Sequence, residues 1–331
     1  MRFALVFCIP AIRSLSRTLA LLCAALALPA FAQSAYPNKP IRVIVQFPAG
    51  GAADTILRII ANPLGQALGQ PMVVENRPGA DGAIAADATM KAAPDGYTLF
   101  MATNSALSAV PALRKNPPYN PLTDFTPVGR VGYFSFFLFV NPQVPVKNVQ
   151  ELIAYIRANP GKVNYAGATS TGIMAAAQLA SHAKLDMVRV PYKGEAPATI
   201  DLIGGQVQLM FATTTNALAP AKEGRLKVLS TLLGQRSPVL PDVPTMPEAG
   251  APKLSIVPWA GFFGPARLPQ DIVVKVNREL NNVIRRPEVR EQVEKQSFEL
   301  HGSTPEELAA FTREQLDTWK GAVRDSGIAP D

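Results

Sequence analysis

Short apolar runs rich in β-branched residues alternate with helical segments along most of this chain. Apolar runs of this kind, bounded by Gly, Pro, Asn and Asp, predict buried strands, whereas longer periodic segments predict helices. The strands are expected at 41–47, 71–75, 97–102, 131–140, 162–166, 188–190 and 207–211. The alternation of helices and strands continues through 226–232. The helices are expected at 55–68, 83–92, 149–158, 173–182, 198–203, 271–286 and 305–324. This alternation predicts parallel α/β sheets, with a ligand crevice at the carboxyl ends of the strands.

Two of these strand-to-helix connections are rich in small residues. FPAGGAAD (47–54) follows the first strand, and GATSTG (167–172) follows a strand in the second half of the chain. The start of a helix offers free N–H groups and a positive dipole end, which together attract an anion. Neither loop contains Lys or Arg. If the loops face one cleft, we expect neutral donors near Gly50, Gly51 and Ala52, and near Ser170, Thr171 and Gly172, to share a carboxylate.

The first 32 residues predict a cleaved export signal. They contain three arginines, an apolar stretch at 19–28 and the small-x-small triplet 30–32, and the apolar stretch is too short to span a bilayer. Both cysteines, Cys8 and Cys23, lie in this leader, so the remaining 299 residues have no thiol chemistry. The leader arginines account for 3 of the +7 charges, which leaves +4. That mild charge gives no basic stripe for nucleic acid, and the length suggests two domains.

Several polar residues also have purely structural interpretations. Asp54, in a first helical turn, is expected to complement the helix dipole, or alternatively to orient water or a ligand amine. Tyr192 and Trp259 are more typical of a core than of a cleft, and His182 and His301 are expected at the surface. Two caps are also predicted. Asn148 is expected to cap helix 149–158, and Ser303 with Glu306 to form a capping box before helix 305–324.

An enzyme is the alternative to a binding protein, and a hydrolase using Ser170 is its most specific form. That chemistry requires a base, yet neither of the two histidines lies near a predicted loop end. Gly167 and Ser170 also lie one residue too far apart for a G-x-S-x-G elbow. Without cysteines or a histidine pair a metal site is not expected either, and we predict neither metal nor cofactor. A ligand sensor that contacts a membrane partner would use the same kind of site as a solute-binding protein.

Six motifs resemble one known family. FPAGGAAD (47–54), ENRPGADG (75–82), APDGYTL (93–99), VPYKG (190–194), DLIGGQVQLMF (201–211) and LPDVPTMPEAG (240–250) are similar, in order, to the Bug or TctC-like receptors. These are the solute-binding proteins of tripartite tricarboxylate transporters. The resemblance implies a periplasmic α/β protein with the type II periplasmic-binding-protein fold, in which two lobes and two crossover strands enclose a ligand cleft. It places one lobe at 36–135 plus 257–331 and the other at 136–256.

The resemblance also implies a binding site for a small carboxylate between the lobes. The predicted ligand-binding residues come from two loops and from neighbouring strand ends: Phe47, Gly50, Gly51, Ala52, Asp54, Asn104, Ser105, Ala168, Thr169, Ser170, Thr171, Gly172, Tyr192 and Thr213. The expected partners are the carboxylate and membrane transporter subunits, with no nucleic acid, and the chain is expected to be a monomer.

This sequence departs from the family pattern at two places. It has Thr171-Gly-Ile-Met-Ala175 where relatives often have Ser-Ser-x-His-Leu, and Ala212 stands where an acid commonly follows Leu-Met-Phe. Both changes remove polarity from the expected pocket lining. We therefore expect an apolar or aromatic carboxylate rather than an amino acid.

Overall fold

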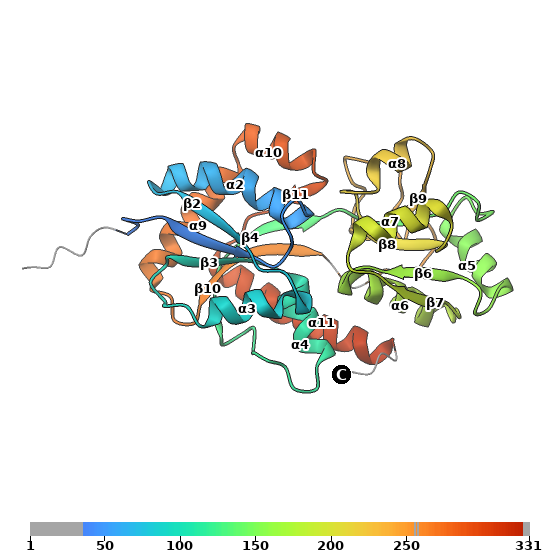
Figure 1. The fold of residues 1–331 in the computed structure, drawn as a ribbon, viewed down its shortest axis with the longest axis horizontal. Helices are drawn as coiled ribbons and strands as arrows, with labels where there is room; N and C mark the ends of the chain where they lie inside the picture. Colours follow the sequence, from blue (N-terminus) through green and yellow to red (C-terminus); the bar gives the residue numbers. More distant parts are fainter. Residues whose placement is uncertain (1–35, 255, 257, 327–331) are drawn as a thin grey trace, which may run out of the picture. The chain divides into compact units, whose positions relative to one another are not determined.

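The computed structural model describes residues 36–254, 256 and 258–326, and its strands form two separate sheets (Figure 1). The six-stranded sheet has the order β11-β4-β10-β3-β1-β2 and consists of β1 (Ile41–Val45), β2 (Met72–Asn76), β3 (Thr98–Thr103), β4 (Phe125–Phe134), β10 (Trp259–Pro265) and β11 (Phe298–Leu300). The five-stranded sheet has the order β7-β6-β8-β5-β9 and consists of β5 (Phe136–Val140), β6 (Asn164–Gly167), β7 (Val188–Pro191), β8 (Leu209–Thr213) and β9 (Lys227–Thr231). The predicted signal peptide at 1–32 lies outside the described residues.

Helices cover both sheets. Those that accompany the six-stranded sheet are α2 (Ala52–Leu68), α3 (Ala83–Met90), α4 (Val110–Leu113), α9 (Gln270–Ile284), α10 (Pro287–Glu294) and α11 (Pro305–Asp325), together with a 3₁₀ turn (Ala80–Gly82) and a π-helical turn (Ser105–Ala109). Those of the five-stranded sheet are α5 (Val149–Ala158), α6 (Ser170–Ala183), α7 (Glu195–Gly204) and α8 (Leu218–Lys222). No helix within the described part of the chain is both long and apolar enough to cross a bilayer.

The five-stranded sheet is the middle layer of three. On β5, Phe136, Leu138 and Val140 pack against apolar side chains of α5 and α6. Phe137 and Phe139 point to the opposite face and pack against α7. A strand that is buried on both faces reads as one continuous apolar run, which is why this segment shows no alternation of polar and apolar residues.

The predicted single strand at 131–140 is wrong, because the chain changes sheets at Ser135. β4 ends in the six-stranded sheet and β5 begins in the five-stranded one. Between them, Ser135 N donates to Ser297 O at 2.8 Å, and its hydroxyl lies 3.0 Å from Ser237 Oγ. The apolar run is continuous because one half enters each core, so hydrophobicity alone gives no sign of the break.

In each sheet, the carboxyl ends of the parallel strands lie next to a segment that connects one sheet to the other. In the six-stranded sheet, Thr103 at the end of β3 pairs with Ala260 at the start of β10. In the five-stranded sheet, Thr213 at the end of β8 pairs with Phe136, directly after the crossing at Ser135. Ligand sites of α/β sheets form at carboxyl ends, so both sheets present their binding edges next to the crossings.

The predicted capping box of the last helix is displaced by one residue. Thr304 Oγ1 accepts from Glu307 N at 3.1 Å, and Glu307 Oε2 accepts from Thr304 N at 2.9 Å. The expected cap, Ser303, instead accepts from Arg130 N at 3.0 Å and so holds β4. The prediction of Ser303 and Glu306 is therefore wrong, although the helix itself lies where it was expected. The predicted cap of α5 is confirmed, because the Asn148 side chain accepts from Glu151 N at 2.9 Å.

Candidate functional site

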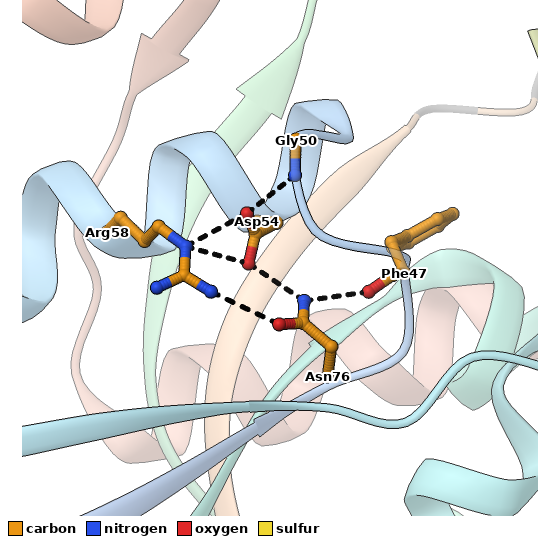
Figure 2. Close-up of polar contacts among 5 residues, drawn as sticks. All are labelled: Phe47, Gly50, Asp54, Arg58 and Asn76. Atoms are coloured by element: carbon orange, nitrogen blue, oxygen red, sulfur yellow. Dashed lines mark hydrogen bonds and ion pairs between the residues drawn. The ribbon is translucent and has the colours of Figure 1, made fainter. Parts of the chain in front are cut away.

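The loop between β1 and α2 is held closed by the Asp54 carboxylate (Figure 2). Asp54 accepts from Gly50 N at 2.9 Å and from Arg58 Nε at 3.0 and 3.1 Å. Asn76 Nδ2, at the end of β2, donates to Asp54 Oδ1 at 2.8 Å and to Phe47 O at 2.9 Å. Arg58 Nη2 also donates to Asn76 Oδ1 at 3.1 Å, which closes a ring of contacts around the loop.

These contacts give Asp54 a structural role. Its side chain is only 2% exposed, and its carboxylate faces the loop, helix α2 and β2. Burial acts to raise the pKa of Asp54, but the hydrogen bonds from Arg58, Asn76 and Gly50 outweigh it and hold the pKa below its usual value. Of the two interpretations given by the sequence, an acid in the first turn that complements the helix dipole matches this geometry.

The amide donors of the first loop differ from the predicted set. Gly50 N–H donates to Asp54, and Gly51 N–H donates to Pro48 O at 3.1 Å, so both amides have partners inside the loop. The first intrahelical bond of α2 runs from Thr55 N to Gly51 O at 2.9 Å. The Ala52 amide precedes that bond, and helix geometry therefore gives it no intrahelical acceptor.

The second loop starts helix α6 with a side-chain cap. Thr169 has extended backbone angles, and its hydroxyl accepts from Gly172 N at 3.1 Å. The Ser170 and Thr171 amides lie in the same first turn, ahead of the bond from Ile173 N to Thr169 O at 2.9 Å. A Cβ at Gly172 would lie 2.5 Å from Phe211 O, so only glycine lets this turn sit directly against β8.

One hydrogen bond connects the two halves of the predicted site. Asn104 Nδ2, directly after β3, donates to Thr171 Oγ1 on α6 at 2.8 Å. Asn104 is 3% exposed and Thr171 is 4% exposed, so the bond is buried. Ser105 is buried beside Asn104 and begins the π-helical turn, while Ala168 packs against the core on the α7 side of the five-stranded sheet.

A cavity of about 810 Å³ lies beside this contact and is lined by residues of both halves. Its lining combines apolar side chains with four charged residues and three serines: Asp81, Val110, Leu113, Arg114, Tyr165, Ser170, Ile173, Met174, Ala177, Ala180, Ser181, Leu185, Met187, Arg189, Asp325 and Ser326. Ser170 thus opens into a hollow shared by the two halves. No residue of the first loop, 47–54, is part of this lining.

The remaining predicted residues are each paired with a carboxylate that the sequence did not point to. Thr213 donates from its backbone N to Glu195 Oε1 at 3.1 Å and from its hydroxyl to Glu195 Oε2. Tyr192 donates its hydroxyl to Asp201 Oδ2 at 2.8 Å. Burial, together with this bond, raises the pKa of Tyr192 to about 12, so the phenol stays protonated at neutral pH.

The expectation that Ala212 lines the pocket is wrong. Its side chain is fully buried in the apolar core between β8 and α7, on the same face of the strand as Met210 two residues earlier. The acid near this strand end is Glu195, which approaches Thr213 from the first turn of α7. The loss of an acid at Ala212 therefore carries no information about the polarity of the site.

Gln46 and Asn76 are two further residues that shape the site and were not predicted as part of it. Gln46 is 4% exposed, donates to Asp81 O at 3.2 Å and accepts from Thr103 N at 3.3 Å, which ties the end of β1 to the end of β3. Asn76 closes the first loop as described above. Both are polar residues at the end of an apolar strand, and this pattern could have marked them in the sequence. The pattern does not show which residue each of them contacts.

Neither histidine is placed to activate Ser170. His182 and His301 are both exposed, as expected from the sequence. His182 lies in the last turn of α6, whereas Ser170 is the first residue of that helix. The ring of His301 contacts Arg130 at 3.0 Å. The described geometry thus places neither histidine beside this serine.

Comparison with known proteins identifies the family. The model of the tripartite tricarboxylate transporter family receptor, TctC, matches residues 56–328. Protein BugT of Bordetella pertussis is 37% identical over 297 residues, which cover 88% of this chain and 90% of that protein.

Two solved structures from Rhodopseudomonas palustris have the same fold. A protein with adipate gives a TM-score of 0.83 at 29% identity and covers 89% of this chain and 100% of its own. MatC with bound malate gives a TM-score of 0.78 at 32% identity, with coverage of 87% and 100%. On this evidence, the chain belongs to the TctC family of tripartite tricarboxylate transporter receptors and has the two-lobed α/β fold of its periplasmic solute-binding proteins.

Proposed function

We propose that this chain binds a small organic carboxylate between two lobes in the periplasm and presents it to a tripartite tricarboxylate-type transporter. The observation that carries the proposal is the hydrogen bond from Asn104 to Thr171, which brings together strand and helix ends from both sheets. The adipate- and malate-bound relatives support a carboxylate as the ligand class. We take the lobes to be 36–135 plus 257–331 and 136–256, and the binding unit to be a monomer.

Neutral donors carry the binding in this proposal. The Ala52 amide starts α2, and the Ser170 and Thr171 amides start α6, so each helix directs its positive dipole end toward the ligand edge. The nearest cation to the first loop, Arg58, is already paired with Asp54. Uncharged donors hold a carboxylate without forming a direct ion pair, which suits a protein that must also release its ligand.

We further propose that the ligand has an apolar or aromatic body. Ile173 and Met174 follow the α6 loop and line the shared cavity, and Val110 and Leu113 line it from the other half. Apolar side chains together with placed polar groups are usual in a small-molecule site, and Arg114 and Arg189 also line this cavity. In this proposal the chain binds its ligand without chemical turnover, since Ser170 has no base beside it.

Thermal unfolding of the purified protein tests the ligand class. The panel contains adipate, malate, benzoate and phenylacetate, with glutamate, aspartate and the neutral amides of the same acids as controls. A ligand at 100 times its Kd stabilises a protein by about 2.7 kcal/mol, which is readily measured. We expect stabilisation by carboxylates and none by the amides. Stabilisation by aspartate or glutamate alone would refute the apolar preference, and no stabilisation by any carboxylate would refute the function.

A further inference from the structure

The end of β8 carries an ordered chain of polar side chains. Thr213, its last residue, donates from its backbone N to Glu195 Oε1 at 3.1 Å and from its hydroxyl to Glu195 Oε2. The Thr215 hydroxyl lies 3.3 Å from Thr213 Oγ1. Thr213 therefore donates a hydrogen bond to each of the two carboxylate oxygens of Glu195.

When Glu195 is ionised, its two hydrogen bonds to Thr213 fix the direction of the Thr213 hydroxyl proton. A threonine hydroxyl has one proton to donate and two lone pairs that accept, whereas an ionised carboxylate only accepts. The Thr213 proton therefore points at Glu195, and the contact to Thr215 uses Thr213 as an acceptor. The Thr213 hydroxyl can therefore only accept a hydrogen bond from any further group.

Thr213 lies at the ligand edge of its sheet. It pairs with Phe136 next to the crossing between the sheets, and it is partly exposed. β6 and β8 run parallel, with Tyr165 opposite Leu209. The first turn of α6 lies against the end of β8, since a Cβ at Gly172 would lie 2.5 Å from Phe211 O, two residues before Thr213.

Resting on the proposed function, we propose that Glu195 is a specificity-determining residue that makes the Thr213 hydroxyl a hydrogen-bond acceptor, so that the site prefers a carboxylate bearing a hydroxyl donor. The ligand carboxylate only accepts hydrogen bonds, so it cannot bond to the Thr213 hydroxyl and is repelled by Glu195. It is therefore directed to the amides at the start of α2 and α6. A hydroxyl on the ligand can donate to the remaining lone pair of the Thr213 hydroxyl. Sites built to bond a substrate hydroxyl discriminate strongly against the analogue without one.

Two pairs of acids that differ only by one hydroxyl provide the test. Malate and succinate form one pair, and mandelate and phenylacetate form the aromatic pair. Affinities are measured by titration calorimetry at pH 8, because burial raises the pKa of Glu195 and the carboxylate form is required. For the wild-type protein we expect the hydroxy acid of at least one pair to bind about 10-fold more tightly than its partner.

Three variants at Glu195 and Thr213 test whether the direction of their hydrogen bond, rather than the local fold, sets the ligand preference. Glu195→Gln places an amide donor against Thr213 and frees the hydroxyl proton, so the preference should fall to about 1 or reverse. Thr213→Val removes the hydroxyl and should also bring the ratio to about 1, whereas Thr213→Ser keeps the hydroxyl and should retain the preference. Glu223→Gln, at an exposed site after α8, controls for the loss of one negative charge. Circular dichroism establishes that each variant is folded.

The outcomes distinguish this inference from the function on which it rests. Equal affinities within both pairs for the wild-type protein, or an unchanged ratio in both Glu195→Gln and Thr213→Val, would overturn the inference while carboxylate binding stands. If none of the four acids binds, the proposed function fails and the inference fails with it.

Discussion

Asn104 Nδ2 lies 2.8 Å from Thr171 Oγ1, and this buried hydrogen bond links the end of β3 in one sheet to the first turn of α6 in the other. Asn104 directly follows the end of β3, and Thr171 lies in the first turn of the helix that follows β6. A contact of this kind is made only when the two binding edges are close together. Under the proposed function, we expect this contact to contribute to ligand binding.

The first prediction concerns this pair. Asn104→Ala and Thr171→Val should each weaken carboxylate binding, because each removes the bond that brings the edges together. In a double-mutant cycle the coupling between the two residues should be about 0.5–1.5 kcal/mol, the net value of a neutral hydrogen bond. Titration calorimetry on the wild type, both single variants and the double variant measures it. Strictly additive losses would contradict a direct contribution of this contact.

The second prediction tests the Ala52 amide as a ligand donor. Ala52 is the first residue of α2, and Gly51 before it is extended (φ −71°, ψ 162°), so proline fits this position and removes only the N–H. Ala52→Pro should leave the unfolding temperature nearly unchanged and weaken carboxylate binding about 10-fold, as expected for one hydrogen bond to a charged group.

A matched control is available at the start of α9. Gln270 is likewise the first residue of a helix after an extended residue, and it is exposed. Gln270→Pro should leave both stability and binding unchanged. Equal affinities of Ala52→Pro and the wild type would remove this amide from the proposed site.

The third prediction concerns acid stability. The folded-state pKa of Asp54 lies below its usual value of 3.8, so its contribution to stability is fully present above that pH and is lost as the pH falls through the folded-state pKa. Asp54→Asn should lower the free energy of unfolding at pH 7 by roughly 1–3 kcal/mol, because Arg58 and Gly50 lose a charged acceptor. The difference from the wild type should shrink toward low pH.

Urea unfolding between pH 2 and pH 7 measures this dependence. Asp87→Asn, which removes an exposed ion pair with Lys91 on α3, is the control and should change stability little at any pH. A deficit of Asp54→Asn that stays constant down to pH 2 would show that the carboxylate charge is not what stabilises the loop.

Most of the fold was predictable because the parallel strands are short apolar runs separated by glycine and proline. Helix 149–158 was expected with its boundaries and its Asn148 cap as observed. The break at Ser135 was not predictable, since apolar residues continue through it into a second core. Helix α10 and strand β11 were also missed, because α10 has few apolar residues and β11 is only three residues long.

The sequence predicts where candidate residues lie along strands and helices, but not which side chains contact each other. The sequence placed Asn104 and Thr171 at strand and helix ends, and the structure adds the hydrogen bond between them. It also placed Thr213, but Glu195 is 18 residues away along the chain and reaches Thr213 only through the packing of α7 on β8. Side-chain partners of this kind depend on tertiary packing, which a local sequence pattern does not contain.

The last prediction uses the capping box that the sequence placed one residue too early. Thr304 and Glu307 exchange hydrogen bonds with each other's backbone amides, so both side chains satisfy N–H groups that helix α11 leaves open. Thr304→Ala should lower the free energy of unfolding by about 1 kcal/mol, the usual cost of losing an N-cap. Glu307→Ala should also be destabilising, because the Thr304 amide then loses its acceptor.

Glu306→Ala is the decisive comparison, because Glu306 lies in the same first turn and has the same charge. Its removal loses only the interaction with the helix dipole, which is worth about 0.3–1 kcal/mol and is screened by salt. Urea unfolding in 0.5 M NaCl should therefore separate the two glutamates, with Glu307→Ala retaining its deficit and Glu306→Ala approaching the wild type. If instead both deficits disappear in 0.5 M NaCl, the charge of the first turn, rather than the reciprocal hydrogen bonds, stabilises the start of α11.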